Sequence, residues 1–168
     1  MKVNDVIKTS DKAFGILRQF VKVGFTCGSF DLMHAGHVLM LEECKKYCNY
    51  LVVGLQSDPT IDRPIKNKPI QSLEERRLIL ESMRCVDEIV TYDTEEDLVN
   101  LLKELIEDKQ IDLRIIGEDW RGKRFTGDEL DLPVVYNLRK HNYSSSNLRE
   151  RVYQAEYLLR VGNKNNPI

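Results

Sequence analysis

The sequence predicts one doubly wound α/β domain, in which a five-stranded parallel sheet carries helices on both of its faces. Three observations support this fold class. Five short apolar segments alternate with segments of helical periodicity along the 168 residues, as in strand–helix units joined by right-handed crossovers. Residues 50–55 (YLVVGL) are apolar throughout, as expected of a strand that is covered on both faces. Polar residues gather directly after the strands, where ligands bind in such sheets.

The first half of the domain contains two predicted strands and two predicted helices. A strand at residues 21–26 leads into a helix at residues 34–47, and the second strand spans residues 50–55. After an irregular polar segment, Ser72-x-x-Glu75 forms a capping box that opens a helix over residues 72–83. Helical spacing predicts that this helix turns four apolar side chains inward: Leu73, Leu78, Ile79 and Met83.

The second half continues the alternation. Thr94-x-x-Asp97 opens a helix that ends near residue 108 and has an apolar stripe at helical spacing. A predicted strand at 87–92 precedes this helix, and predicted strands at 113–116 and 133–136 follow it. A last helix at 147–159 comes after a polar turn at 139–146. The predicted domain therefore spans residues 21–160, between an N-terminal extension at 1–20 and a loose tail at 161–168.

Composition excludes several classes of function. With 25 basic and 27 acidic residues the net charge is −2, which gives no support to general nucleic-acid binding. No segment resembles a membrane span or a secretion signal, so we expect a cytoplasmic protein with no membrane partner. The four cysteines show no disulfide-like framework and are expected to be reduced. Cys44 and Cys48 are predicted to share the inward stripe of the first helix with Leu41.

Residues 24–38 (GFTCGSFDLMHAGHV) are the most informative stretch. They form a strand, a glycine-containing turn and a helix N-terminus, where free N–H groups and the helix dipole favour a phosphate. His34 and His37 add two imidazole donors there, and Gly36 between them permits close approach. A zinc site is the alternative, but the only other histidine is His141 and there is no Cys-x-x-Cys pair. The pattern therefore favours phosphate binding and predicts no protein-bound metal.

Four polar loops follow the carboxyl ends of predicted strands. They are the turn with His34 and His37, the loop with Lys66 and Lys68, the connection that begins at residue 118, and the turn at residues 139–146. Because these ends meet at one edge of a parallel sheet, we expect the four loops to converge on one crevice.

With these residues in view, the chain resembles the cytidylyltransferase family of nucleotidyltransferases, and within it the enzymes that act on glycerol 3-phosphate. The resemblance covers residues 23–151 and implies a Rossmann-like fold. His-x-Gly-His marks the wider superfamily, whereas four motifs in order are more specific. These are GSFDLMHAGHVLMLEECKK, RCVDEIV (residues 84–90), GEDWRGK (117–123) and RKHNYSSSNLRER (139–151).

The resemblance implies transfer of CMP from CTP to a phosphorylated small alcohol, most of all glycerol 3-phosphate. The acceptor phosphate attacks the α-phosphorus in line and pyrophosphate leaves, so catalysis consists of positioning and charge stabilisation. Mg²⁺ is expected as the cofactor, bound through phosphates and water. Residues 84–90 lie at the dimer interface in the family, which implies a homodimer.

The same resemblance assigns roles to individual residues. His34, His37, Lys68 and Arg139 would be catalytic. Lys66, Arg76 and Arg84 would bind the acceptor or support the site, and both arginines have the alternative of lying on a helix surface. The nucleotide would be bound by Thr26, Cys27, Gly28, Ser29, Phe30, Gly117, Glu118, Asp119, Trp120, Arg139, Tyr143, Ser144, Ser145 and Ser146.

The chain also departs from the family pattern. The family's Gly-Ile-Ser-Thr is replaced by Asn142-Tyr143-Ser144-Ser145, and Glu95 stands where glycerol-phosphate enzymes carry an acceptor-side tryptophan. Two other functions therefore stay open beside cytidylyl transfer. One is adenylyl transfer to a sugar phosphate, and the other is a non-catalytic nucleotide-binding module on the same fold.

Overall fold

A computed structural model describes residues 20–108, 110–138 and 140–164. The sheet contains β1 (Val23–Gly28), β2 (Tyr50–Gln56), β3 (Glu88–Tyr92), β4 (Leu113–Gly117) and β5 (Val134–Asn137). All pairings are parallel and the order is β3-β2-β1-β4-β5. The chain winds outward from β1 through β2 to β3 and then crosses to β4 and β5. The direction of winding therefore reverses between β1 and β4, at the centre of the sheet.

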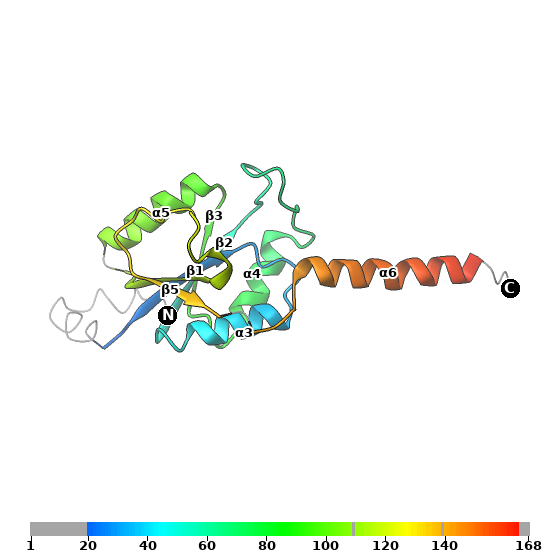
Figure 1. Cartoon of the computed structure of the whole chain (residues 1–168), viewed down its shortest axis with the longest axis horizontal. Coiled ribbons are helices and arrows are strands. Elements are labelled where there is room, and N and C mark those ends of the chain that lie inside the picture. The colour runs from blue at the N-terminus through cyan, green and yellow to red at the C-terminus, as the bar shows by residue number, and fades with distance from the viewer. Residues whose placement is uncertain (1–19, 109, 139, 165–168) are drawn as a thin grey trace.

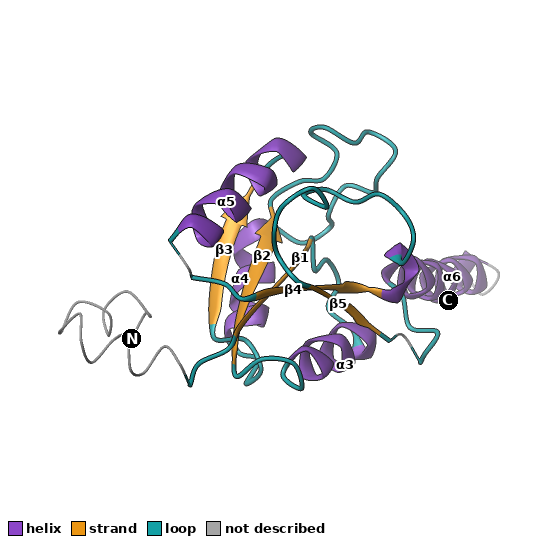
Figure 2. Cartoon of the chain, turned by 60° about the vertical axis from the view of Figure 1, so that its left-hand side comes forward, coloured by secondary structure: helices purple, strands orange, loops and turns teal. Residues whose placement is uncertain are grey.

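Helices cover both faces of this sheet, as predicted (Figures 1 and 2). α3 (Ala35–Cys44) and α4 (Leu73–Glu81) contribute Leu41, Cys44 and Leu80 to a buried cluster on one face. α5 (Glu95–Glu107) contributes Leu98, Leu102 and Leu105 to a second cluster on the other face. The sheet is thus sandwiched between two apolar layers, and its polar carboxyl edge is left open between them.

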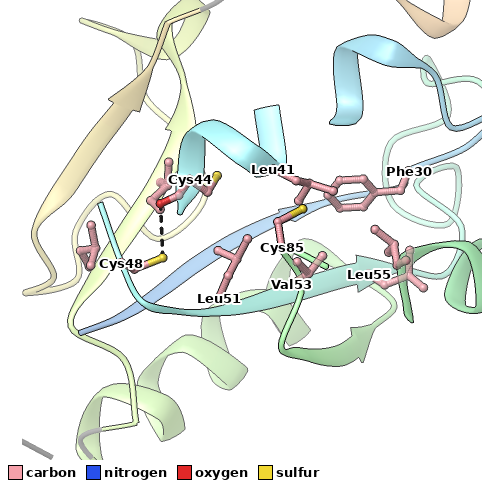
Figure 3. Close-up of a cluster of buried hydrophobic side chains, with 11 residues drawn as sticks. Phe30, Leu41, Cys44, Cys48, Leu51, Val53, Leu55 and Cys85 are labelled. Atoms are coloured by element: carbon pink, nitrogen blue, oxygen red, sulfur yellow. Dashed lines mark hydrogen bonds between the residues drawn. The ribbon is translucent and has the colours of Figure 1, made fainter. Parts of the chain in front are cut away.

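The cysteines are reduced, as predicted, but the first helix is shorter than the predicted 34–47: α3 ends at Cys44, so Cys48 is buried just beyond the helix and not on its stripe. Cys27, Cys44, Cys48 and Cys85 are all free thiols. Cys44 and Cys48 are buried beside Leu41, and the Sγ of Cys48 donates to the carbonyl oxygen of Cys44 at 3.3 Å (Figure 3). Burial raises the pKa of the Cys44 thiol to about 12, so this thiol is protonated and inert at neutral pH.

Local signals explain the helix starts. Ser72 and Glu75 form the predicted capping box of α4, and Thr94 and Asp97 form that of α5. The predicted inward stripe of α4 is wrong in one position, because Leu78 is 60% exposed. The side chains of this helix that are fully buried are Arg76 and Leu80. The prediction used only the spacing of apolar residues, so it did not identify the buried arginine.

α6 (Ser145–Lys164) is longer than predicted at both ends and includes residues 161–164 of the expected tail. Its first turns lie at the carboxyl edge of the sheet, and its outer part projects away from the domain (Figure 1). Residues 151–161 are all exposed. Within the described residues, no helix combines the length and apolar content that crossing a bilayer requires.

Candidate active site at the carboxyl edge of the sheet

Two cavities open at the carboxyl ends of the strands. The smaller, of about 490 Å³, lies between α3 and residues 137–145. The larger, of about 940 Å³, lies between the end of β1, residues 56–67, the start of α5 and residues 114–129. Met40, Gly117 and Ser145 line both cavities. Two adjoining cavities can hold two substrates whose reactive ends meet at the shared residues.

His34 and His37 lie at the N-terminus of α3, on the wall of the smaller cavity. Their rings stack with centroids 4.1 Å apart. The backbone N–H of Gly36 donates to Nδ1 of His34 at 3.0 Å, and the backbone N–H of His34 donates to Nδ1 of His37 at 3.4 Å. Because both Nδ1 atoms accept, each neutral ring carries its proton on Nε2. The pair is therefore set to donate N–H groups to an anion at a helix N-terminus.

Asp31 connects the turn between β1 and α3 to two other segments. Its carboxylate accepts from the backbone N–H groups of Ile70 and Gln71, at 3.0 Å each, and from Arg149 of α6 at 2.5 Å. Burial alone would raise the pKa of Asp31, but these hydrogen bonds and the Arg149 charge hold that pKa below its usual value. The hydroxyl of Ser145 donates to the Asp31 carbonyl at 3.2 Å and lies 3.4 Å from Nε2 of His34. The first turns of α6 are thus attached directly to the histidine pair.

Arg76 supports the same turn from below. Its side chain is buried, with 1% exposed, so the alternative of a helix-surface residue is wrong for this arginine. The guanidinium donates to the carbonyl oxygens of Ser29 and Gln56 at 2.7 Å and of Ser57 at 2.5 Å. These bonds join the ends of β1 and β2 to α4, so the geometry favours site support over direct substrate binding.

The larger cavity is lined by a polar network. Glu95 pairs with Arg63 at 2.8 Å and accepts a hydrogen bond from the hydroxyl of Thr126. Arg114 of β4 is buried, donates to the Thr126 carbonyl, and has its guanidinium 5.3 Å from the centre of the Phe125 ring. Carboxylate, hydroxyl and guanidinium groups in one cavity suit a small polar ligand that carries hydroxyl and anionic groups.

Most of the predicted site residues come together at these two cavities. The smaller cavity is lined by His34, His37, Gly117, Asp119, Tyr143, Ser144 and Ser145. The larger cavity is lined by Thr26, Cys27, Gly28, Ser29, Lys66, Gly117, Trp120 and Ser145. Phe30 is buried beneath the turn, with φ at 48°, and its ring centroid lies 5.6 Å from that of His37.

Besides Phe30 and Arg76, four predicted residues line neither cavity. The Lys68 side chain is 80% exposed, with its Nζ 3.8 Å from Asp58. Arg84 is exposed in the segment after α4, and Ser146 is exposed in the first turn of α6. Glu118 pairs with Arg121 at 2.5 Å. Arg139 lies outside the described residues.

Several residues of the site were not predicted. Asp31 lies inside the GSFDLMHAGHV stretch, so its position in the strand–turn–helix segment was an available signal. No sequence signal marked Arg114 or Arg149 as site residues, because an arginine in a short strand or on a polar helix is normally expected to be an exposed charge. His141 joins the smaller cavity through the turn after β5, and its position next to residues 142–146 was an available signal.

Comparison with known proteins agrees with this geometry. The cytidylyltransferase-like family model matches residues 25–151. Glycerol-3-phosphate cytidylyltransferase of Bacillus subtilis (strain 168) is 36% identical over 133 residues, which are 79% of this chain and 98% of that protein. The bifunctional protein HldE of Wolinella succinogenes is 39% identical over 111 residues, which are 65% of this chain and 22% of that protein.

Solved structures show the same fold. A lipopolysaccharide core biosynthesis protein from Thermoplasma volcanium superimposes with a TM-score of 0.54 at 25% identity, over 74% of this chain and 99% of that chain. A putative nicotinate-nucleotide adenylyltransferase from Vibrio parahaemolyticus gives 0.54 at 16% identity, over 80% and 88% of the two chains, which supports the fold alone. The sheet order, the histidine pair and the family match lead to one conclusion: the chain belongs to the cytidylyltransferase-like family of nucleotidyltransferases.

Proposed function

We propose that this nucleotidyltransferase transfers CMP from CTP to a phosphorylated small alcohol and releases pyrophosphate. The observation that carries the proposal is the stacked pair of His34 and His37, whose Nδ1 atoms both accept backbone N–H groups beside Ser145 at the start of α6. Two helix N-termini and two imidazole donors around one cavity suit a triphosphate. Glycerol 3-phosphate is the first acceptor to test, because of the likeness to the Bacillus subtilis enzyme.

The two cavities suggest where each substrate binds. The triphosphate would lie in the smaller cavity, against His34, His37 and Ser145. The acceptor would enter the larger cavity, where Lys66 can bind its phosphate and Glu95 and Thr126 can bind its hydroxyl groups. In this arrangement Thr26, Cys27, Ser29 and Trp120, which the resemblance assigned to the nucleotide, lie on the acceptor side. An acceptor phosphate oxygen would then bond to the α-phosphorus as the bond to the bridging oxygen breaks. The imidazole Nε2–H groups would donate to the phosphoryl oxygens, which gain charge in the transition state.

Mg²⁺ is part of this proposal. Among the residues that the structure describes, no three His, Cys, Asp or Glu side chains converge on a point that could hold a metal ion. The cation would be held mainly by triphosphate oxygens and water. When bound there, it would offset the charge of the triphosphate.

The central experiment measures pyrophosphate release from the four nucleoside triphosphates, each paired with glycerol 3-phosphate and with several sugar phosphates. CTP with a phosphorylated alcohol is expected to turn over. Turnover with ATP and a sugar phosphate would instead establish adenylyl transfer. Nucleotide binding without pyrophosphate release from any pair would establish a binding module.

We also propose that the protein forms a homodimer through residues 84–90. Sedimentation equilibrium tests this proposal.

His37→Ala tests the role of the imidazole pair. Loss of one transition-state donor is expected to lower kcat by about a hundredfold or more, with little change in melting temperature. Glu42→Ala is the matched control, because Glu42 is an exposed residue of the same helix and lines neither cavity. Full activity of the His37→Ala enzyme would reject the assignment.

A further inference from the structure

A third histidine lies in the smaller cavity, on the segment between β5 and α6. His141 lines this cavity together with His34 and His37. A Cβ atom placed on Gly36 would lie 2.8 Å from Cε1 of His34 and 2.8 Å from Cε1 of His141. The two rings therefore flank the bare backbone of Gly36. Three imidazoles thus gather at the N-terminus of α3.

One nitrogen of this third ring is unpaired in the free protein. Nδ1 of His141 is shielded from solvent and has no hydrogen-bond partner among the described residues. The ring also lies against Tyr143, with ring centroids 5.2 Å apart. A buried polar atom without a partner costs free energy. A ligand in the cavity can supply the missing partner, or can bind the other nitrogen of a ring that Tyr143 holds in place.

The position of His141 indicates which part of the nucleotide it would contact. His34 and His37 extend from the end of β1, whereas Lys140, His141 and Ser144 form another part of the lining of the smaller cavity. An in-line displacement places the attacking and leaving groups on opposite sides of the phosphorus. If the acceptor attacks from the larger cavity, pyrophosphate leaves into the smaller cavity, on the side of residues 140–145.

We propose that His141 donates a hydrogen bond to the departing pyrophosphate, in addition to the donors from His34 and His37. This inference rests on the proposed function. The bond between the α-phosphorus and the bridging oxygen breaks, the electron pair goes to that oxygen, and the acceptor oxygen replaces it on phosphorus. His141 keeps its proton throughout and stabilises the charge that appears on the leaving group. Lys140 lines the same cavity and adds positive charge there.

The reverse reaction gives the sharpest test, because pyrophosphate is then a substrate. His141→Leu is expected to raise KM for pyrophosphate by about tenfold to a hundredfold, the usual effect of losing one hydrogen bond to a charged group. KM for the cytidine diphosphate alcohol should stay near the wild-type value. His141→Gln retains an N–H donor and should restore part of the pyrophosphate affinity. Asn142→Ala is the matched control, because Asn142 is the exposed neighbour and lines neither cavity.

Two results would overturn the inference. One is an unchanged KM for pyrophosphate in His141→Leu. The other is an equal loss for both reverse substrates together with a lower melting temperature, which would indicate a purely structural role. Calorimetric titration with magnesium pyrophosphate separates this inference from the proposed function, because it needs no turnover. If no substrate pair reacts, the proposed function fails. Weaker pyrophosphate binding by His141→Leu than by wild type would still support the His141 site, and equal binding would reject it.

Discussion

Replacing Arg76 by methionine tests how the turn between β1 and α3 is held in place. The substitution keeps an apolar stem of similar length but removes every donor. Five carbonyl oxygens then lose guanidinium hydrogen bonds. Those of Ser29, Gln56 and Ser57 are bonded at 2.5 to 2.7 Å, and those of Gln71 and Ser72 share Nε at 3.2 Å. Hydrogen bonds that involve a charged group contribute about 1.5–3 kcal/mol each. In the wild-type protein, the stabilisation by these hydrogen bonds is partly offset, because burial disfavours the charged guanidinium and lowers the pKa of Arg76.

The expected net loss is about 3–5 kcal/mol of unfolding free energy, as for other buried charged groups whose bonds are broken. Urea titration followed by circular dichroism measures it, with the midpoint and slope compared to wild type. Arg77→Met is the matched control, because Arg77 is the next residue of α4 and makes only an exposed pair with Glu81 at 2.9 Å. That variant should lose about 0.5 kcal/mol or less. A loss below about 1 kcal/mol in Arg76→Met, or equal losses in the two variants, would refute the reasoning.

Two further predictions concern the turn and the cavity. The pKa of Asp31 is lowered from 3.8 in the folded protein, so the stability that its charge contributes is present above pH 3.8 and lost as pH falls through the folded value. Asp31→Asn should therefore flatten the loss of unfolding free energy below pH 3.8, and an unchanged acid profile would contradict this. In Gly36→Ala the new Cβ would lie 2.8 Å from Cε1 of both His34 and His141. The rings must shift, so CTP affinity should fall by about tenfold or more, because a close-packed site does not absorb an added methyl group. Calorimetry measures that affinity, and wild-type affinity would show that the rings need not lie where the structure has them.

The sequence predicted the fold well because its signals are local. Apolar strand runs, two capping boxes and alternating periodicity each depend on residues that are close in the chain. The histidine pair was predictable for the same reason, since strand, turn and helix N-terminus lie within residues 24–38. Convergence of the loops also followed from topology, because the carboxyl ends of parallel strands meet at one edge.

Contacts that join distant segments were not predictable. Arg76 is buried only because α4 crosses beneath the ends of β1 and β2, and nothing in its local sequence distinguishes it from the half-buried Arg77. The Asp31–Arg149 pair joins residues 118 positions apart. Lys68 shows the reverse case: its loop reaches the site, and its carbonyl accepts from Arg149, but its side chain extends into solvent.

In the described part of the chain, α6 is attached to the domain only at its base, so a small tilt there would produce a large movement of its far end. Ser145 and Arg149 hold the first turns against the Asp31 turn, whereas residues 151–161 are all exposed. A helix of this length extends about 30 Å, at 1.5 Å per residue. A tilt of about 10° at its base would therefore carry its far end through about 5 Å. A fluorophore or spin label on the outer turns would convert small adjustments of the Asp31 turn into displacements large enough to measure as distances.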